Sequence, residues 1–223
     1  MLYTRANYTS VTDPLTGWRK QHYFKKGSSE EMKAQFFKSF KNLTRDANQE
    51  AYIFDDGTWK LYSNVERRRG KRGDHRERTQ IKYDPSLELD TLFSKNQIKK
   101  TESLFDQLKN RKLPQIFWTS FSRILDLIMQ IRNTDDEGRD IILSPIGNAQ
   151  ERFDSRKRYD QLPRDENGLV IEESAFEYPT SGDANGAYNI ARKGVMMLER
   201  IKEKPEKPDL LIRDAEWDIK ITN

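Results

Sequence analysis

The segment Ser181–Ile190, SGDANGAYNI, places one carboxylate, Asp183, between small residues at the start of a predicted helix. A carboxylate in the first turn of a helix could bind a divalent metal ion, and Gly182, Ala184 and Gly186 would let a phosphate backbone come close. Asp is also a common N-cap, which is the ordinary explanation for a single Asp before a helix. The segment by itself leaves both roles open.

The composition limits the kind of metal site that the chain could build. Its 223 residues contain no Cys, so disulfides and thiolate zinc sites are excluded, and with only two His we do not expect a His-rich site. Oxygen ligands remain, and these suit Mg²⁺ or Mn²⁺. A two-metal nuclease needs several carboxylates from different elements, because two ions flank the scissile phosphate. With 34% charged residues and no apolar run long enough to span a bilayer, we expect a soluble protein without a membrane partner.

A basic run, ERRRGKRGDHRER, occupies residues 66–78. Its seven Lys and Arg residues against three acids carry a net charge of +4, which equals the net charge of the whole chain. Two glycines favour a loop over a helix. The run is either a solvated surface loop or a loop that contacts phosphate, since guanidinium groups match phosphate oxygens. The candidate nucleic-acid-binding residues are Arg67, Arg68, Arg69, Lys71, Arg72 and Arg76.

Local patterns predict the elements of the first half of the chain. Residues 8–18 suggest a short strand followed by a turn. Ser28 and Glu31 form a capping-box pattern that would open a helix. The segments 50–55 and 58–63, joined by Asp56-Gly57, predict a β-hairpin. Two short helices are expected next, one capped by Ser86 and one over about residues 99–108.

The longest helix is predicted from Pro114, with an apolar stripe that continues to Ile131. A polar turn over 133–138 and a strand over 140–143 should follow, and then a loop-rich region. A final helix is expected over 184–202, before strands near 209–213 and 217–221. Its predicted apolar face consists of Ala187, Ile190, Ala191, Met197, Leu198 and Ile201. The whole pattern indicates a mixed α+β fold.

Five segments of the chain, taken in order, resemble one family. They are YTSVTDPLTGW (8–18), LIMQIRNT (127–134), RDIILSPI (139–146), ERFDSR (151–156) and GDANGAYNIARKG (182–194). All five are similar to segments of the type V-A CRISPR effector nucleases, the RNA-guided DNA endonucleases of the Cpf type. The resemblance implies an inserted Nuc domain flanked by segments of an RNase H-like RuvC fold. Residues 1–17 would be the RuvC segment after motif II, 18–180 the Nuc domain, and 181–223 the RuvC motif III segment with its helix and terminal strands.

The resemblance also implies an activity. The chain would be the C-terminal nuclease region of a longer enzyme that hydrolyses target and non-target DNA strands with Mg²⁺ or Mn²⁺. The first two acidic RuvC motifs have no match here, so the remaining metal ligands are expected outside this chain and the isolated chain is expected to be inactive. Its partners would be target DNA and a guide CRISPR RNA, in a monomeric protein of the prokaryotic cytoplasm.

Four residues receive roles through the resemblance. Asp183 matches the third RuvC carboxylate, a metal ligand, and Arg132 matches a Nuc arginine implicated in DNA cleavage. Asn133 and Asp140 match neighbouring polar positions in the Nuc groove. Simpler roles stay open, because Arg132 could complement a helix C-terminus and Asp140 could be a turn residue. In place of the family's Asp-Ala before the motif aspartate, this chain has Ser181-Gly182.

Two alternatives to an enzyme remain. The chain could be a non-catalytic module that binds DNA and loads strands into a site completed by other residues, or a protein-interaction domain. A salt-dependent affinity for single-stranded DNA would separate these two alternatives.

Overall fold

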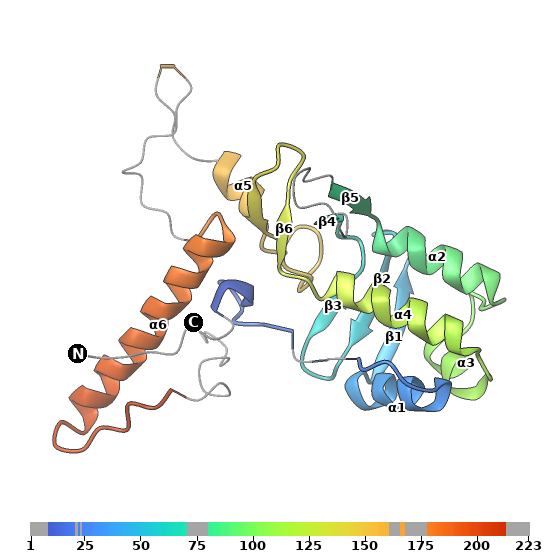
Figure 1. Ribbon diagram of the computed structural model, residues 1–223, viewed down its shortest axis with the longest axis horizontal. Coiled ribbons are helices and arrows are strands. Elements are labelled where there is room, and N and C mark those ends of the chain that lie inside the picture. Colours follow the sequence, from blue (N-terminus) through green and yellow to red (C-terminus); the bar gives the residue numbers. More distant parts are fainter. Residues whose placement is uncertain are drawn as a thin grey trace.

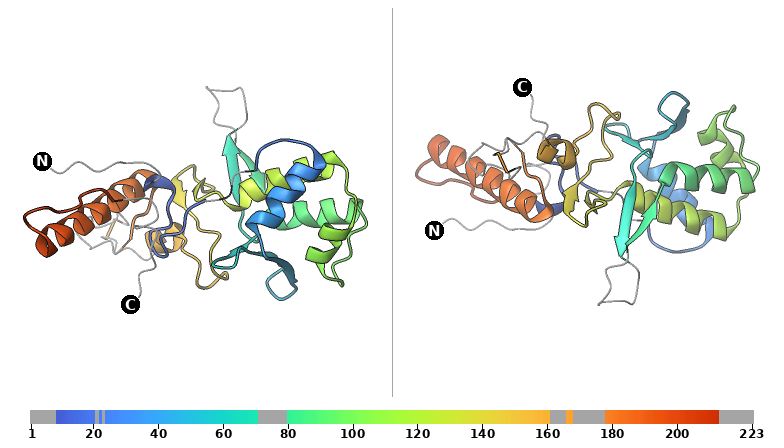
Figure 2. Two further views of the ribbon diagram at one scale, coloured as in Figure 1. Left: turned by 90° about the horizontal axis from the view of Figure 1, so that it is seen from below. Right: turned by 90° about the horizontal axis from the view of Figure 1, so that it is seen from above.

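The computed structural model of the chain describes residues 9–20, 22, 24–70, 80–160, 166–167 and 178–212. The fold is mixed α+β, as predicted. One end of the molecule contains the 3₁₀ helix η1 (Thr9–Val11) and the helix α6 (Gly182–Glu203), and the other end contains shorter helices packed on a small sheet (Figures 1 and 2). Among the described residues, no helix combines the length and the apolar character needed to cross a membrane.

The sheet at that second end has three antiparallel strands, β1 (Asn42–Asp46), β2 (Ala51–Asp55) and β3 (Lys60–Tyr62), in this order. The predicted hairpin is confirmed as β2 and β3. Its turn is built by Asp56, whose Oδ1 accepts hydrogen bonds from the backbone N–H groups of Thr58 and Trp59. Strand β1 was not expected, because a segment with a single fully buried residue has little of the alternation that marks a strand.

Four helices share one hydrophobic core with this sheet: α1 (Ser29–Ser39), α2 (Pro85–Lys95), α3 (Leu104–Asn110) and α4 (Gln115–Ile128). The capping box predicted at Ser28 is confirmed at the start of α1. The prediction for α2 was wrong about its cap, which is Asp84. Ser86 is buried instead, where its hydroxyl pairs with that of Ser63 at 2.7 Å.

An aromatic core joins the helices to the sheet. Phe36 of α1 lies at its centre, with ring centroids within 6.5 Å of those of Phe37, Phe40, Phe54, Phe105, Trp118 and Phe121. The apolar stripe of α4 is buried here, as expected, except for its first predicted member, Ile116, which is 71% exposed. However, α4 ends at Ile128 after 14 residues, so it is shorter than predicted, and the 22-residue α6 is longer.

Between the two ends lie two short antiparallel pairs, β4 (Arg67–Gly70) with β5 (Gln80–Tyr83), and β6 (Arg132–Thr134) with β7 (Asp140–Ile142), together with α5 (Ser155–Asp160) (Figure 1). The strand predicted over 140–143 is confirmed as β7. Residues 67–70 form a strand rather than the expected loop, and α5 lies in a region expected to be loop. Arg132 begins a strand and does not end a helix.

Helix α6 packs against η1 through its polar side. Asn185 Nδ2 donates to the carbonyl oxygen of Thr12 at 2.7 Å, and Asn189 Nδ2 donates to that of Thr9 at 2.9 Å. Both asparagines are fully buried, whereas Ile190 and Leu198 are 37% and 51% exposed. The predicted apolar face of α6 was therefore wrong for Ile190 and Leu198, although Met197 is buried as predicted. The asparagines take this place because the segment of η1 and Thr12 presents carbonyl groups that need donors.

The strands predicted within residues 8–18 and near 209–213 differ from the structure. In place of the strand expected within 8–18, residues 9–11 form η1. Residues 209–212 form no strand, and residues 217–221 lie outside the described part of the chain.

Candidate functional site

Three charged side chains from three elements meet between the two ends of the molecule: Arg132 of β6, Asp140 of β7 and Asp183 of α6. In the register of β6 with β7, Arg132 lies opposite Ile142 and Thr134 lies opposite Asp140. Arg132 and Asp140 are thus diagonal neighbours on one face of the hairpin. Arg132 Nη2 donates to Asp140 Oδ2 at 3.0 Å.

Asp140 also connects this hairpin to the first turn of α6. The backbone N–H of Gly182 donates to Asp140 Oδ2 at 2.7 Å. The first N–H groups of a helix have no partner within the helix and carry a partial positive charge, so a carboxylate is favourable there. One oxygen of Asp140 therefore accepts from both the arginine and the helix, and it holds them together.

Asp183 lies beside this pair with its side chain 94% exposed, and its Oδ1 is 3.7 Å from Arg132 Nη2. The N-cap of α6 is Ser181, whose Oγ accepts from the backbone N–H of Ala184 at 3.2 Å. The explanation of Asp183 as the helix cap is therefore wrong. Its role as a metal ligand stays a prediction.

The charge and donor types of this cluster suit a hard cation only in part. Two carboxylates and one guanidinium leave one net negative charge, and the exposed Asp183 carboxylate is the kind of ligand that Mg²⁺ prefers. Asp140 is already engaged by the arginine and by α6. Within the described ranges, no three His, Cys, Asp or Glu side chains are grouped so that they could hold a metal ion.

Asn133 has a structural role in place of the predicted catalytic one. Because side chains alternate along a strand, it points to the opposite side of β6 from Arg132, where it is 6% exposed. Its Oδ1 accepts from the backbone N–H of Arg68 at 2.8 Å, and its Nδ2 donates to the carbonyl oxygen of Glu66 at 2.9 Å. Both ends of the amide are thus used to hold β4 beside β6.

The arginine side chains that the structure describes in the basic run contact other groups of the protein. Arg67 is fully buried, and its guanidinium donates to the carbonyl oxygens of Leu143 at 2.8 Å and Ile128 at 2.9 Å, so its predicted nucleic-acid contact is wrong. The guanidinium of Arg68 pairs with Glu66 and Asp136. The side chain of Arg69 and the residues Lys71, Arg72 and Arg76 lie outside the described part of the chain.

The turn between β6 and β7 depends on a buried carboxylate that the sequence did not single out. Asp135 Oδ1 accepts from the backbone N–H groups of Glu137 at 3.0 Å and Arg139 at 2.8 Å, and Oδ2 pairs with Arg139 Nε at 2.5 Å. Burial raises the pKa of the Asp135 carboxyl, but the hydrogen bonds and the charge of Arg139 outweigh it, and the pKa lies below its usual value.

This lowered pKa predicts an acid-sensitive hairpin. A carboxyl with a depressed folded-state pKa stabilises the protein above the unfolded-state pKa, and the stabilisation is lost as the pH falls through the folded-state pKa. We expect Asp135→Asn to lower the urea unfolding midpoint most above about pH 4, with a smaller difference from wild type in more acidic solution. The exposed neighbour Glu137→Gln serves as control. An equal difference at pH 7 and pH 3 would show that the charge of Asp135 is unimportant.

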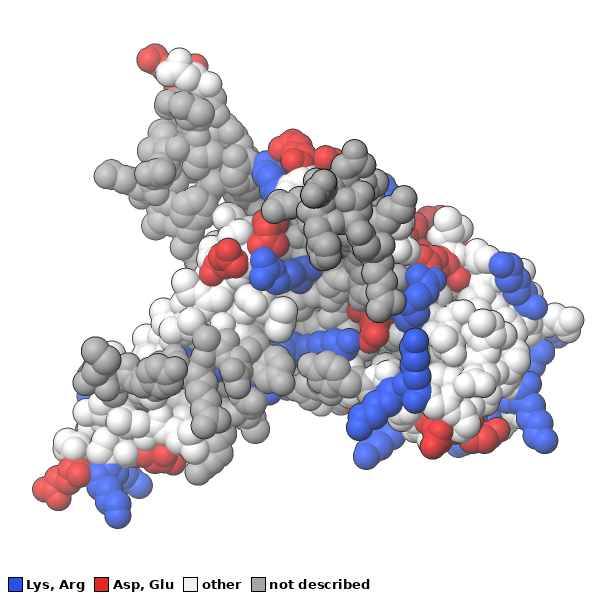
Figure 3. Space-filling model, viewed as in Figure 1, with Lys and Arg blue, Asp and Glu red and all other residues white. Residues whose placement is uncertain are grey.

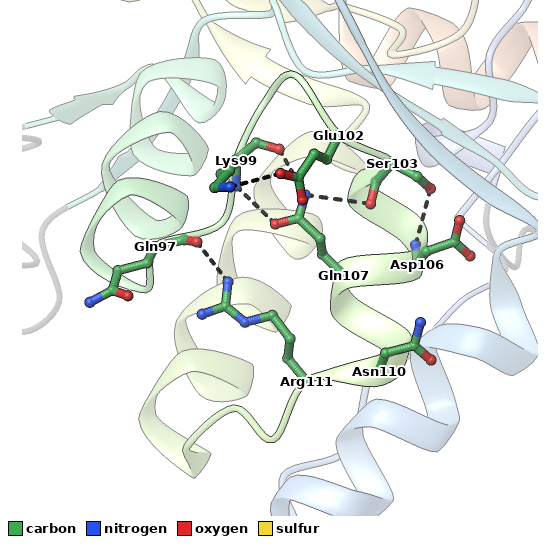
Figure 4. A pocket seen from close by; sticks show the side chains of 8 residues that line it. All are labelled: Gln97, Lys99, Glu102, Ser103, Asp106, Gln107, Asn110 and Arg111. Atoms are coloured by element: carbon green, nitrogen blue, oxygen red, sulfur yellow. Dashed lines mark hydrogen bonds and ion pairs between the residues drawn. The ribbon is translucent and has the colours of Figure 1, made fainter.

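Elsewhere, the described residues form two further surface hollows. One, of about 610 Å³, is formed around α3. Its polar side chains bond mostly to backbone groups of the same region, as in the Arg111 hydrogen bond to the Gln97 carbonyl oxygen at 2.7 Å, and Lys99 and Glu102 form an ion pair at 2.8 Å (Figure 4). The other, of about 580 Å³, is an apolar groove between α2 and α4. Neither hollow is lined by Arg132, Asp140 or Asp183. Helix α3 lies at the end of the molecule away from α6 (Figure 1).

Comparison with known families shows that residues 12–157 match a nuclease domain. The matched range includes both strands of the β6–β7 hairpin and therefore Arg132 and Asp140, and it ends before Asp183. It covers more than half of the chain. The chain therefore belongs to the nuclease (NUC) domain family.

Proposed function

We propose that this chain is the C-terminal nuclease region of an RNA-guided DNA endonuclease and takes part in the hydrolysis of target and non-target DNA strands. Membership of the nuclease domain family indicates a nuclease function. The observation that carries the proposal is the position of Arg132, which Asp140 holds against the first turn of α6, 3.7 Å from the exposed carboxylate of Asp183.

In this proposal Asp183 is a ligand of Mg²⁺ or Mn²⁺, and the remaining ligands come from outside this chain. The metal would stabilise the charge that develops on the phosphoryl oxygens and activate the attacking water. Asp183 suits this role because its side chain is almost fully exposed and the helix does not need it as a cap.

Arg132 would bind the phosphate. A guanidinium has five N–H donors, and the two carboxylates lie at Nη2, so other donors can reach a phosphate oxygen. Asp140 fixes the orientation of the guanidinium in advance, and such prior orientation lowers the barrier to reaction. We therefore assign Asp140 to positioning Arg132.

Sequence recognition would come from elsewhere. In RNA-guided enzymes, base pairing with the guide reads the target, while the protein holds the backbone. We propose target DNA and guide RNA as partners of a monomeric prokaryotic cytoplasmic protein, and the flanks 1–17 and 181–223 as RuvC segments. The close packing of η1 on α6 supports the idea that these flanks form one unit. The remaining candidates for contacts with the nucleic-acid backbone are Arg69, Lys71, Arg72 and Arg76.

The spread of charge does not by itself select the DNA-binding surface. On the face shown in Figure 3, both Lys and Arg side chains and Asp and Glu side chains are present over most of the described surface. A general affinity for DNA is therefore weaker support for the proposal than a loss of cleavage caused at one residue.

The test is DNA cleavage by the full-length protein that contains this chain, with Mg²⁺ or with excess EDTA. We expect Arg132→Ala to reduce Mg²⁺-dependent cleavage by about 10- to 100-fold, because a misplaced or missing orienting group costs that much. The control is Arg123→Ala, which removes an exposed arginine of α4 whose side chain pairs with Glu88 of α2. The isolated 223-residue chain should not cut DNA.

The outcomes separate the alternatives. Wild-type cleavage by Arg132→Ala, or robust Mg²⁺-dependent nicking by the isolated chain, would contradict the proposal. If Arg132→Ala lowered cleavage and the affinity for single-stranded DNA by the same factor, and also lowered the salt dependence of that affinity, the result would favour a strand-loading module. Cleavage that persists in EDTA would exclude the metal ligand role.

A further inference from the structure

A group of basic side chains lies at the end of the molecule away from α6, where α1 and α3 are neighbours (Figure 1). They come from the segment before α1, from α1 itself, and from the end of α3 and the segment that leads to α4. We call this group the α1–α3 basic surface, and its members are Lys25, Lys26, Lys33, Lys109, Arg111 and Lys112. All of them are at least partly exposed.

Two hydrogen bonds bring the two parts of this surface together, although they are about 80 positions apart in the chain. Lys33 Nζ donates to the carbonyl oxygen of Arg111 at 3.5 Å. The side-chain amide of Gln115 donates to the carbonyl oxygen of Gly27 at 2.9 Å. Each member of the α1–α3 basic surface lies within two residues of one of these contacts, so the six cations share one region of the surface.

The members of the α1–α3 basic surface differ from nearby surface cations in their lack of ion pairs. On neighbouring elements, cations are paired with acids: Lys99 with Glu102, Lys100 with Asp90, and Arg123 with Glu88. Within the described part of the chain, by contrast, no Asp or Glu side chain pairs with any of the six. Ion pairing, and not the number of cations, therefore distinguishes this surface.

The acids in the same stretches have roles of their own. Glu30 and Glu31 lie in the first turn of α1, and Asp106 lies in the first turn of α3, where the positive end of the helix dipole favours a carboxylate. Six cations against these three acids leave a net charge of +3. A helix C-terminus likewise favours Lys109, which is in the last turn of α3.

Helix dipoles do not account for the other exposed lysines. Lys25, Lys26 and Lys112 are exposed and belong to no helix. Exposed cations of one sign that converge without acidic partners attract a polyanion, and guanidinium and ammonium groups bind phosphate oxygens. The α1–α3 basic surface therefore suits a nucleic-acid backbone.

The aromatic rings beside these cations indicate which form of nucleic acid fits. Sites for single strands combine cations with aromatic rings on which the bases stack. Here Phe37 and Phe105 pack edge to face against each other, with ring centroids 4.9 Å apart, and both lie against the hydrophobic core. The surface offers charge without a stacking platform, which matches a duplex whose bases are already stacked on one another.

We infer that the α1–α3 basic surface binds the phosphate backbone of double-stranded DNA. The contact carries no sequence information, because phosphate contacts position a protein on a duplex without reading bases. The inference goes beyond the proposed function, since the surface is separate from the Arg132 site and its binding needs no cleavage. In the proposed nuclease, it would hold duplex DNA at the end of the domain away from α6.

Two triple variants with the same change in net charge test this inference. The surface variant combines Lys26→Gln, Lys109→Gln and Lys112→Gln. The control variant combines Lys202→Gln, Lys204→Gln and Lys207→Gln. These control lysines are also exposed, and they lie at the end of α6 and just after it, with Glu203 and Glu206 between them. We expect both variants to melt near the wild-type temperature, because no change is in the core.

The measurement is the affinity of the 223-residue chain for a DNA duplex of mixed sequence, and for one of its single strands, over a range of salt concentrations. For the duplex, the slope of log affinity against log salt should become shallower by about 2–3 in the surface variant, since each lost phosphate contact removes about 0.9. The duplex affinity should fall by about 10-fold or more at low salt. The control variant should keep nearly the wild-type slope and affinity.

Three results would overturn the inference: no duplex binding by the wild-type chain at low salt, equal slopes in the two variants, or a loss confined to the single strand. Equal slopes would mean that only the net charge matters, and a loss confined to the single strand would assign the surface to unpaired DNA. The proposed function is tested separately by cleavage in Arg132→Ala, so either can fail while the other stands.

The wild-type chain provides a second test that does not depend on the folding of a variant. Added duplex should shift the backbone amide signals of Gly27 and Arg111 in ¹⁵N–¹H spectra more than those of Glu203 and Glu206. Duplex binding that left the signals of Gly27 and Arg111 in place would show that the DNA binds elsewhere, and the inference would be wrong.

Discussion

Asp183→Asn in the full-length protein should reduce DNA cleavage by about 10²- to 10³-fold and leave the melting temperature almost unchanged. The side chain of Asp183 is 94% exposed, and the cap of α6 is provided by Ser181, so the substitution breaks no capping hydrogen bond. The loss of one negative charge from the first turn of a helix costs only about 0.3–1 kcal/mol. Asn keeps the size of the side chain but brings no charge to a metal ion.

The measurement is the cleavage rate and the melting temperature of the same preparation, with guide-directed DNA binding determined in parallel. Binding should persist, because base pairing and backbone contacts away from this site supply it. Asp106→Asn is the control, since Asp106 also lies in the first turn of a helix that a serine caps, in α3. Cleavage near the wild-type rate in Asp183→Asn would show that this carboxylate is not a metal ligand.

Arg67→Ala should lower the free energy of unfolding by about 3–5 kcal/mol, because it leaves buried polar groups without a partner. The guanidinium joins three elements: it extends from β4 to the carbonyl oxygen of Ile128 at the end of α4 and to that of Leu143 just after β7. Burial lowers the pKa of the Arg67 guanidinium, and Arg152 and Arg156 add to this effect. An arginine nevertheless stays protonated in proteins, so the buried charge depends on its two acceptors.

Denaturant unfolding of three variants tests this role. Arg67→Lys should also destabilise the protein, because one ammonium group does not reproduce the fork that reaches both carbonyl groups. Arg68→Ala, next along β4, is the control and should cost about 1 kcal/mol or less, since its partners Glu66 and Asp136 lie nearer the surface. Unchanged stability in Arg67→Ala, with a weaker salt dependence of single-stranded DNA binding, would restore the phosphate-contact hypothesis.

The features that the sequence alone determined depend on residues close together in the chain. Ser28 and Glu31 are three residues apart, and their side chains and backbones form the capping box by themselves. The hairpin at Asp56-Gly57 and the buried stripe of α4 are equally local, since turn chemistry and helical periodicity act over a few residues. The family resemblance named Arg132, Asn133, Asp140 and Asp183 and grouped them in one region, but it did not give the hydrogen bonds that each of them makes.

Tertiary structure decided how those residues are used. Arg132 and Asp140 meet because β6 pairs with β7, and a three-residue strand is too short to show a period in the sequence. Gly182 reaches Asp140 across 42 positions of the chain. Arg67 is buried because its guanidinium donates to backbone carbonyl groups on distant segments. Asn185 and Asn189 are buried for the same reason, and they take the place at the contact of α6 that the sequence assigned to apolar side chains. Whether a polar side chain is buried depends on the partners that packing brings to it, and those partners are set by the fold as a whole.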